Sequence, residues 1–116
     1  MQTRRVGISG EEFASKLLES EGYKIIERNF RCKLGEIDII ATKDSSLVFV
    51  EVKTRRSNKY GKPEEAVTLR KIQKIERCGE FYMKFHSNLP KKLRIDVVSI
   101  EINGGKVISS KIIPAI

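Results

Sequence analysis

Acidic residues and a lysine interrupt two otherwise apolar stretches near the middle of the chain. Glu36 and Asp38 belong to the segment GEIDIIA, and Glu51 and Lys53 belong to the segment LVFVEVKTR. Side chains alternate between the two faces of a β-strand, so Glu36 and Asp38 share one face, as do Glu51 and Lys53. Burying charge is costly unless it is paired or used, which makes these four residues candidates for a functional site.

The turn between the two segments sets which charged residues face each other. Residues 43–46 read Lys-Asp-Ser-Ser, which is typical of a turn, so the segments should form a β-hairpin. In the register that a four-residue turn dictates, Asp38 lies directly opposite Glu51, and Glu36 lies opposite Lys53. Like charges at directly opposite positions destabilise a sheet. A hard divalent cation between the carboxylates would remove this repulsion, and Mg²⁺ or Mn²⁺ prefers such oxygen ligands.

The lysine adds a second feature of hydrolytic chemistry. On the same face as Glu51, Lys53 could orient a water nucleophile or neutralise charge that builds up on a phosphate. A structural interpretation is also open, in which Glu36 and Lys53 form a cross-strand ion pair while Asp38 and Glu51 face water. The apolar character of both strands and a basic region downstream favour the metal site.

Capping signals and hydrophobic periodicity predict the elements that position these residues. A capping box with Ser9 as the N-cap and Glu12 at the third helical position begins a helix, which Gly22 ends. Five strands are predicted at residues 23–28, 36–42, 47–54, 93–102 and 106–113, with turns at 31–35, 43–46 and 103–105. A long helix is predicted between the third and fourth strands. The order α-β-β-β-α-β-β indicates an α/β protein in which helices pack against a mixed sheet.

The long helix, residues 63–85, should have one apolar and one basic face. Pro63 fits its first position. Apolar residues recur every three or four positions on the face expected to be buried: Ala66, Leu69, Ile72, Ile75, Cys78 and Tyr82. Arg70, Lys74 and Arg77 line the opposite face.

Composition narrows the functional classes. The 116 residues include 23 Lys and Arg against 15 Asp and Glu, a formal net charge of +8 that predicts a polyanion partner. The length suits one domain, residues 1–116. Because the sequence offers neither an apolar run long enough to cross a membrane nor a secretory signal, we expect a cytoplasmic protein without a membrane partner. Two cysteines, Cys32 and Cys78, and one histidine exclude a disulfide framework and a zinc finger.

The positive charge is concentrated beside the proposed site. Residues 53–77 contain nine Lys or Arg and three Glu. Basic side chains contact phosphates, and tyrosine can stack on a base. The candidates for nucleic-acid contacts are Arg28, Arg31, Arg55, Arg56, Lys59 and Tyr60. Nothing in this set reads base sequence, so we expect structure-directed or non-specific binding.

Together these motifs resemble a known class of nucleases. Asp38, followed after a hairpin turn by Glu51-Val52-Lys53 and preceded by a helix bearing Glu12, resembles the PD-(D/E)XK nuclease superfamily. The segments GEIDIIA and LVFVEVKTR are more narrowly similar to the YraN family of small bacterial endonuclease-like proteins, over nearly the whole chain. Archaeal Holliday-junction resolvases are similar relatives. The resemblance implies a restriction-endonuclease-like αβββαβ core with a mixed central sheet flanked by helices.

The resemblance also implies roles for individual residues. Asp38 and Glu51 would bind the metal, with the Val52 carbonyl as a third ligand, and Lys53 would be the catalytic lysine. Glu12 matches the acidic residue of the first helix that helps to hold the metal or its water in resolvase-like members. A capping-box glutamate also has a structural role, so both interpretations of Glu12 stay open.

Three functions are compatible with the sequence. The first is a Mg²⁺-dependent nuclease acting on DNA. The second is a nucleic-acid-binding module that keeps the nuclease fold without catalysis, and the third is an interaction protein whose charges only cover its surface. The joint presence of Asp38, Glu51 and Lys53 favours the nuclease. A junction-resolving enzyme would need a homodimer to make two symmetric cuts, and the apolar C-terminal strand offers an edge for pairing.

Overall fold

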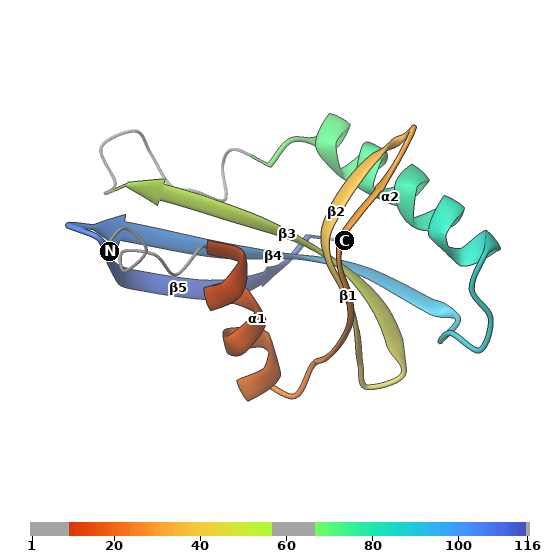
Figure 1. Cartoon of the computed structure of the whole chain (residues 1–116), viewed down its shortest axis with the longest axis horizontal. Coiled ribbons are helices and arrows are strands. Elements are labelled where there is room, and N and C mark those ends of the chain that lie inside the picture. The colour runs from red at the N-terminus through yellow and green to blue at the C-terminus, as the bar shows by residue number, and fades with distance from the viewer. Residues whose placement is uncertain (1–9, 57–66, 116) are drawn as a thin grey trace.

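Five β-strands form one mixed sheet, and the two helices within the described part of the chain pack on its opposite faces (Figure 1). The computed structural model describes residues 10–56 and 67–115. The elements along the chain are α1 (Gly10–Ser20), β1 (Lys24–Cys32), β2 (Gly35–Lys43), β3 (Ser46–Arg56), α2 (Leu69–Lys84), β4 (Lys92–Asn103) and β5 (Lys106–Pro114). This order confirms the predicted sequence of elements.

The strands lie in the sheet in chain order, β1-β2-β3-β4-β5. β3 and β4 run parallel, whereas the pairs β1–β2, β2–β3 and β4–β5 are antiparallel. A parallel pair needs a crossover connection, and α2 lies in the one between β3 and β4. The first six elements therefore have the expected αβββαβ order, and the mixed sheet is confirmed.

Side-chain alternation along β3 divides the hydrophobic core between the two faces of the sheet. Val48 and Val50 pack with α1, whereas Leu47 and Phe49 pack with α2. The Phe49 ring lies so close to Gly79 of α2 that an added Cβ would be 2.2 Å from it. A glycine at this position therefore lets α2 approach the sheet closely.

The hairpin between β2 and β3 has the predicted register but a tighter turn. Thr42 pairs with Leu47 as predicted, and the strands continue to the pair Lys43–Ser46. Only Asp44 and Ser45 remain in the turn, and both have positive φ, 47° and 73°. Two-residue hairpin turns favour this conformation because it matches the twist of the strands. The four-residue turn was therefore wrong in length, while the pairing it implied was right.

The first helix ends where the sequence predicts. The Tyr23 amide donates to the Leu18 carbonyl at 3.0 Å, and the Gly22 amide donates to the Glu19 carbonyl at 3.1 Å. Gly22 has φ 92°, which completes a Schellman motif, a common helix end at glycine. Ser9, the predicted N-cap, lies outside the described residues.

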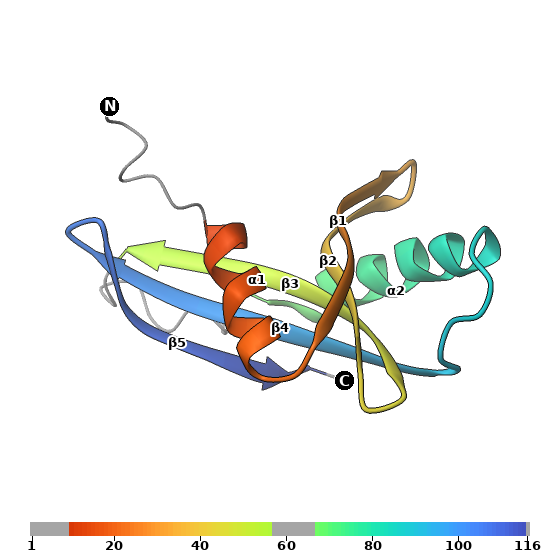
Figure 2. The ribbon, with the colours of Figure 1, turned by 60° about the horizontal axis from the view of Figure 1, so that its bottom comes forward.

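β1 is longer than predicted, and the prediction of a turn over 31–35 was wrong. The strand runs to Cys32, and only residues 33 and 34 form the turn. Pairing with β2, including Phe30 with Ile37, holds this polar segment in extended conformation. Beyond the pair Arg28–Ile39, the end of the β1–β2 hairpin leaves the plane of the sheet and reaches α2 (Figure 2). We call residues 29–38 the arm.

Within the described residues, α2 begins later than predicted, at Leu69. Residues 67 and 68 are not helical, and Thr68 is the N-cap, its hydroxyl accepting from the Lys71 amide at 3.2 Å. Threonine is favoured there because its oxygen satisfies an amide that the helix leaves unpaired. Leu69 is 69% exposed, so its predicted burial was also wrong. Pro63 and Ala66 lie outside the described residues.

Neither of the described helices is both long and apolar enough to cross a membrane.

Candidate functional site

Asp38 lies where β2 separates from β3. The β2–β3 ladder ends at the pair Ile39–Val50, one position before Asp38. Beyond it, the Val52 amide donates a hydrogen bond to Asp38 Oδ2 at 2.8 Å. The carboxylate thus accepts a bond from the backbone of β3 just beyond the last paired position of β2. The separation leaves Asp38 at a gap between the two strands.

The predicted cross-strand pairs beyond the ladder were therefore wrong. Asp38 and Glu51 are not ladder partners, because β2 and β3 separate directly after the pair Ile39–Val50. Glu36 pairs instead with Arg31 of β1, with Arg31 Nε 3.4 Å from Glu36 Oε1. Lys53 lies next to Ser99 in the parallel ladder with β4. The divergence follows from the arm, which turns away toward α2.

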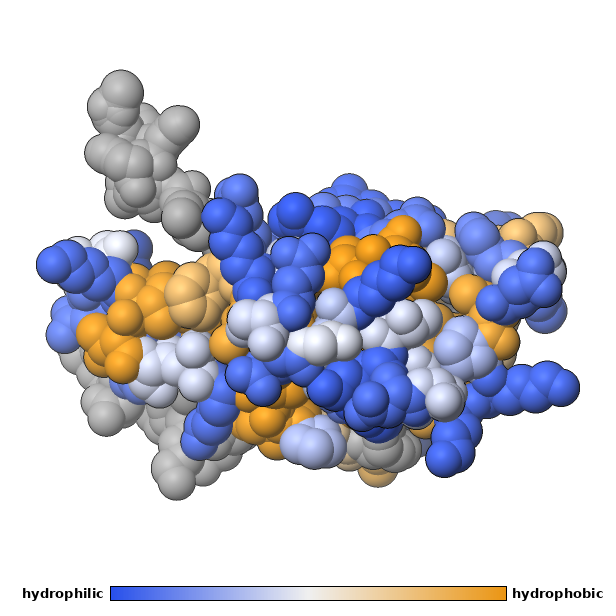
Figure 3. Space-filling model, turned by 90° about the horizontal axis from the view of Figure 1, so that it is seen from below, coloured by the Kyte–Doolittle hydropathy of each residue, from blue (hydrophilic) through white to orange (hydrophobic). Residues whose placement is uncertain are grey.

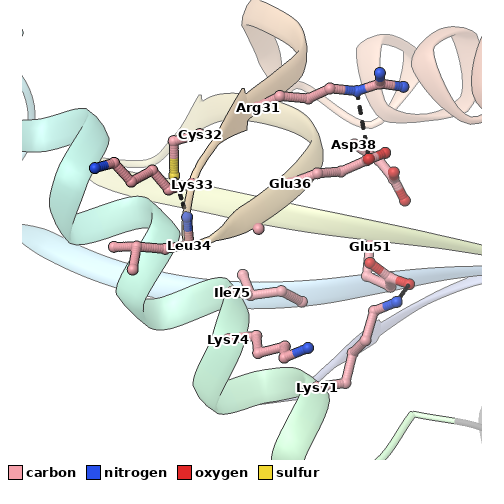
Figure 4. A pocket seen from close by; sticks show the side chains of 11 residues that line it. Arg31, Cys32, Lys33, Leu34, Glu36, Asp38, Glu51, Lys71, Lys74 and Ile75 are labelled. Atoms are coloured by element: carbon pink, nitrogen blue, oxygen red, sulfur yellow. Dashed lines mark hydrogen bonds and ion pairs between the residues drawn. The ribbon is translucent and has the colours of Figure 1, made fainter.

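The separation nonetheless brings Asp38 and Glu51 to one cavity. This cavity has a volume of about 610 Å³ and lies between the arm and α2 (Figure 4). Its acidic side chains are Glu36, Asp38 and Glu51, and its basic side chains are Arg31, Lys33, Lys71 and Lys74. The two predicted metal ligands thus share a space open to a ligand, in a surrounding of cations.

Glu51 is buried and forms an ion pair with Lys71. Its side chain is only 7% exposed, and Lys71 Nζ lies 3.3 Å from Glu51 Oε2 (Figure 4). A buried carboxylate without a partner would be strongly unfavourable, so the ammonium balances its charge in the absence of metal.

Sequence reasoning missed Lys71 as a site residue, although a signal was present. Lys71 precedes the buried residues Ile75 and Cys78 by four and seven positions, so it continues their stripe by one turn. A lysine on the stripe that faces the sheet is a candidate partner for a buried acid. Of the predicted stripe, Ile75, Cys78 and Tyr82 are buried and Ile72 packs against them, as predicted. Among its described members only Leu69 is exposed, and in that first turn it is Lys71 that reaches Glu51.

The surroundings of Asp38 raise its pKa from 3.8 to about 6. Burial is the largest cause, and the hydrogen bond from Val52 works against it. Repulsion from the nearby carboxylates of Glu51, Glu11 and Glu36 raises the pKa further. Part of the rise thus comes from the negative charge gathered around Asp38. A cation placed among these carboxylates would be favourable.

Glu11, not Glu12, is the acid of α1 that lies near Asp38. A second cavity of about 400 Å³ opens on the α1 side and is lined by Gly10, Glu11, Asp38, Val52 and Thr54. Asp38 therefore borders a cavity on each side of the sheet. Glu12 is exposed and lines neither of these two cavities. Successive residues of a helix point about 100° apart, which separates the two glutamates.

Lys53 is half-buried on β3 and shares the face of Glu51 by strand alternation. It is not among the lining residues of the cavity that holds Asp38 and Glu51. The structure therefore brings Asp38 and Glu51 together and leaves Lys53 one step further along the same strand face.

The predicted nucleic-acid contacts are distributed around this site. Arg28 forms an ion pair with Glu11, with 3.8 Å between Nη2 and Oε1, and Arg31 lines the larger cavity. Arg55 and Arg56 lie at the end of β3 and are half-buried and exposed, respectively. Lys59 and Tyr60 lie outside the described residues.

The donor set around the cavity suits a hard divalent cation. Within residues 10–56 and 67–115, no group of three or more histidine, cysteine or acidic residues is placed to hold a metal ion. Mg²⁺ does not need one, since it is commonly held by one or two carboxylates while water and substrate phosphates fill the other positions. Asp38 and Glu51 fit this kind of partial site.

A second polar cluster is buried away from the cavity and was not predicted. Tyr23 Oη donates to Asp96 Oδ2 at 2.6 Å, and Arg94 Nη2 donates to the same oxygen at 3.0 Å. Asp96 is 1% exposed, and burial together with the Asp96 contact raises the Tyr23 pKa to about 12. Its three members satisfy one another, so the cluster fastens Tyr23, the residue before β1, to β4 and is structural.

The fold and the site together define the class of protein. The αβββαβ order, the mixed sheet and two carboxylates on neighbouring central strands correspond to a restriction-endonuclease-like α/β protein. The comparison with known families is specific: residues 10–100 match the family described as "Uncharacterised protein family UPF0102". The chain belongs to this family, which is the YraN family that its motifs resemble.

Relatives from several bacteria cover most of the chain. A UPF0102 protein of Syntrophomonas wolfei is 48% identical over 103 residues, which are 89% of this chain and 90% of that protein. A UPF0102 protein of Caldicellulosiruptor saccharolyticus is also 48% identical over 103 residues, 89% of this chain and 87% of that protein. A UPF0102 protein of Dictyoglomus turgidum is 39% identical over 115 residues, 98% of each chain.

Proposed function

We propose that this chain is a metal-dependent nuclease that hydrolyses phosphodiester bonds of DNA without reading base sequence. The observation that carries the proposal is the meeting of Asp38 and Glu51 in one cavity whose remaining charged side chains are mostly cations. Carboxylates that hold a divalent ion, with lysines and arginines around them, are suited to bind a phosphate and stabilise its charge in the transition state.

Asp38 and Glu51 would hold Mg²⁺ or Mn²⁺. When bound, the ion would act as a Lewis acid on the phosphate and lower the pKa of a water. The hydrogen bond from the Val52 amide keeps the Asp38 carboxylate in one orientation. Lys71 neutralises Glu51 before metal binds and, on a long side chain that is 45% exposed, can move to a phosphate oxygen afterwards. Lys53, on the same strand face as Glu51, would stabilise charge on the phosphate during cleavage.

A panel of labelled substrates tests this proposal. Single-stranded, duplex, flapped and junction DNA, with RNA for comparison, would be incubated with the purified chain and Mg²⁺ or Mn²⁺. We expect cleavage of DNA that stops when the metal is chelated and that is lost in Asp38→Asn. The matched control is Asp44→Asn, the same chemical change at an exposed residue of the β2–β3 turn. Cleavage at an unchanged rate in excess chelator would rule out the metal mechanism.

A second function, nucleic-acid binding without catalysis, has one observation in its favour. Glu51 already has a partner in Lys71, and the described residues include no group of three or more histidine, cysteine or acidic side chains placed to hold a metal ion. If the basic surface binds DNA while no substrate in the panel is cut with either metal, the chain is a binding module that keeps the nuclease fold.

A junction substrate would require two copies of the chain. β5 is an edge strand, and its residues Val107 and Ile108 are 37% and 55% exposed. Figure 3 shows a face on which hydrophilic side chains dominate, with one apolar patch at its left end and smaller ones elsewhere. We propose this edge as the contact of a homodimer in the cytoplasm, to be tested by sedimentation with and without a four-way junction.

A further inference from the structure

Two thiols from distant parts of the sequence meet beside the cavity. Cys32 Sγ of β1 and Cys78 Sγ of α2 lie 3.3 Å apart, although 46 positions separate the residues. Cys32 is half-buried and lines the cavity (Figure 4), whereas Cys78 is fully buried. Both are free cysteines. The two cysteines belong to opposite walls of the cavity, Cys32 to the arm and Cys78 to α2.

The two sulfur atoms differ in reactivity. Burial, as the largest cause, together with the contact with Cys32 and the charge of Glu36, raises the pKa of Cys78 from 9.0 to about 12. Cys78 therefore stays protonated. Cys32 is the sulfur that borders the cavity, and the Leu34 amide donates to it at 3.4 Å. Because Cys32 is the more exposed of the two sulfurs, it is the one that an oxidant would meet first.

We propose that Cys32 and Cys78 form a reversible disulfide that fastens the arm to α2 and makes the site sensitive to peroxide. The Cys32 thiolate attacks hydrogen peroxide, the O–O bond breaks, and the leaving hydroxide takes up a proton to become water. The sulfenic acid formed on Cys32 is then attacked by the Cys78 sulfur. An S–S bond forms, the S–O bond breaks, and the departing hydroxide leaves as water with the Cys78 proton. Two electrons pass from the two sulfurs to the peroxide.

The geometry allows this bond with a small movement. An S–S bond is about 2.05 Å long, so the sulfurs must approach by roughly 1.3 Å. Cys78 lies on the same helix face as Lys71, seven positions later, and Cys32 follows Arg31 in the arm. Closing the bond therefore changes the spacing between the walls that hold Lys71 and Asp38. Displacements of about 1 Å in a catalytic site commonly lower the rate on the order of a hundredfold.

The bond itself is tested without any substrate. The reduced full chain would be treated with stoichiometric hydrogen peroxide, alkylated, and measured by intact and peptide mass spectrometry. We expect a monomer lighter by two hydrogens, a Cys32–Cys78 cross-linked peptide, and full reversal by dithiothreitol. Oxidation should also raise Tm by about 10 °C, because the bond closes a long loop. Unlinked cysteines, Cys32 oxidised only to its acids, or only intermolecular dimers would overturn the proposal.

Two variants identify the roles of the sulfurs. Cys78→Ala should let the Cys32 sulfenic acid accumulate, detected by a dimedone adduct, whereas Cys32→Ala should leave Cys78 unmodified. The reverse pattern would overturn the order of attack. The wild-type measurements above do not depend on either variant folding.

The effect on cleavage rests on the proposed function. In protein that cleaves DNA, oxidation should lower the rate on the order of tenfold to a hundredfold and reduction should restore it. If oxidised and reduced protein cleave equally, the disulfide does not control the site. If neither form cleaves, the proposed function fails while the cross-link result stands.

Discussion

Asp38 Oδ2 accepts a hydrogen bond from the Val52 backbone amide at 2.8 Å, just past the point where the ladder between their strands has ended. One of the two proposed metal ligands is thus tied to the strand that carries the other. The bond fixes the Asp38 carboxylate relative to Glu51 without a side-chain partner. It also explains why the carboxyl can be half-buried, since a polar group withdrawn from water needs a hydrogen bond.

The raised pKa of Asp38 predicts how stability depends on pH in the absence of metal. A carboxyl whose pKa is higher in the folded state binds its proton more tightly there, so stability is lost as pH rises from about 4 through about 6. The loss should amount to at most about 3 kcal/mol. Urea denaturation in chelator at several pH values measures it. Asp38→Asn should abolish the pH-dependent loss. An equal loss in that variant would assign it to other groups.

Without metal, the charge on the Asp38 carboxylate lowers the stability of the folded protein. Binding of a divalent metal should make the same charge stabilising. A ligand that binds only the folded state stabilises it, by about 2.7 kcal/mol at one hundred times its dissociation constant. Millimolar Mn²⁺ should therefore raise Tm of the wild type. Asp38→Asn and Glu51→Gln should show little or no rise. Thermal melts of the three proteins, each in chelator and in Mn²⁺, make the comparison. If the wild type gains nothing from Mn²⁺, the two residues do not form a metal site.

Removing Lys71 should expose the cost of a buried, unpaired Glu51. We expect Lys71→Met to destabilise the metal-free protein by about 1 kcal/mol, a modest value because the lysine is partly exposed. Lys71→Met should also bind Mn²⁺ more tightly, since the ammonium no longer competes for Glu51. Lys74→Met, an exposed lysine that lines the same cavity, is the matched control. In the Glu51→Gln background, Lys71→Met should no longer destabilise. A full effect there would show that the two residues are not coupled.

Lys53→Ala should lower cleavage far more than it lowers DNA affinity. The reason is that its proposed role is to stabilise charge that develops only in the transition state. Single-turnover cleavage and filter binding, measured on the same substrate, separate the two quantities. A parallel loss in both would make Lys53 an ordinary phosphate contact.

Affinity for DNA should fall steeply with salt, because basic side chains release counterions from the phosphates. Arg55→Glu combined with Arg56→Glu should flatten the slope of log affinity against log salt by about one or two. Fluorescence anisotropy from low to physiological salt measures the slope. A slope unchanged by both substitutions would remove the end of β3 from the interface.

The local parts of the fold could be predicted because short-range signals determine them. Gly22 ends α1 where a left-handed residue is needed, and the β2–β3 register follows from Thr42 and Leu47 flanking the turn. A two-residue and a four-residue turn at 43–46 give the same pairing, so the error in turn length did no harm. The helix start was predicted from Pro63, a residue that fits a first helical position, whereas α2 begins after the N-cap Thr68.

The site could be predicted only in part, because its geometry depends on contacts between distant segments. The sequence places Asp38 and Glu51 on neighbouring strands, but the end of their ladder depends on how the arm packs against α2. The same packing brings Lys71 to Glu51 and places Glu11 near Asp38. None of these distances follows from hydrophobic periodicity alone.

The parallel ladder at the centre of the sheet has a consequence for how the chain reaches this structure. It pairs Ser46 with Lys92 at one end and Arg56 with Ile102 at the other, so it joins segments that lie far apart in the sequence. The β1–β2–β3 meander and the β4–β5 hairpin need only short loops to form, whereas the central ladder must first close a long one. Folding should therefore be limited by the meeting of these two preformed halves. Until they meet, the apolar edges of β3 and β4 are both uncovered, and this is when the chain is most prone to aggregate.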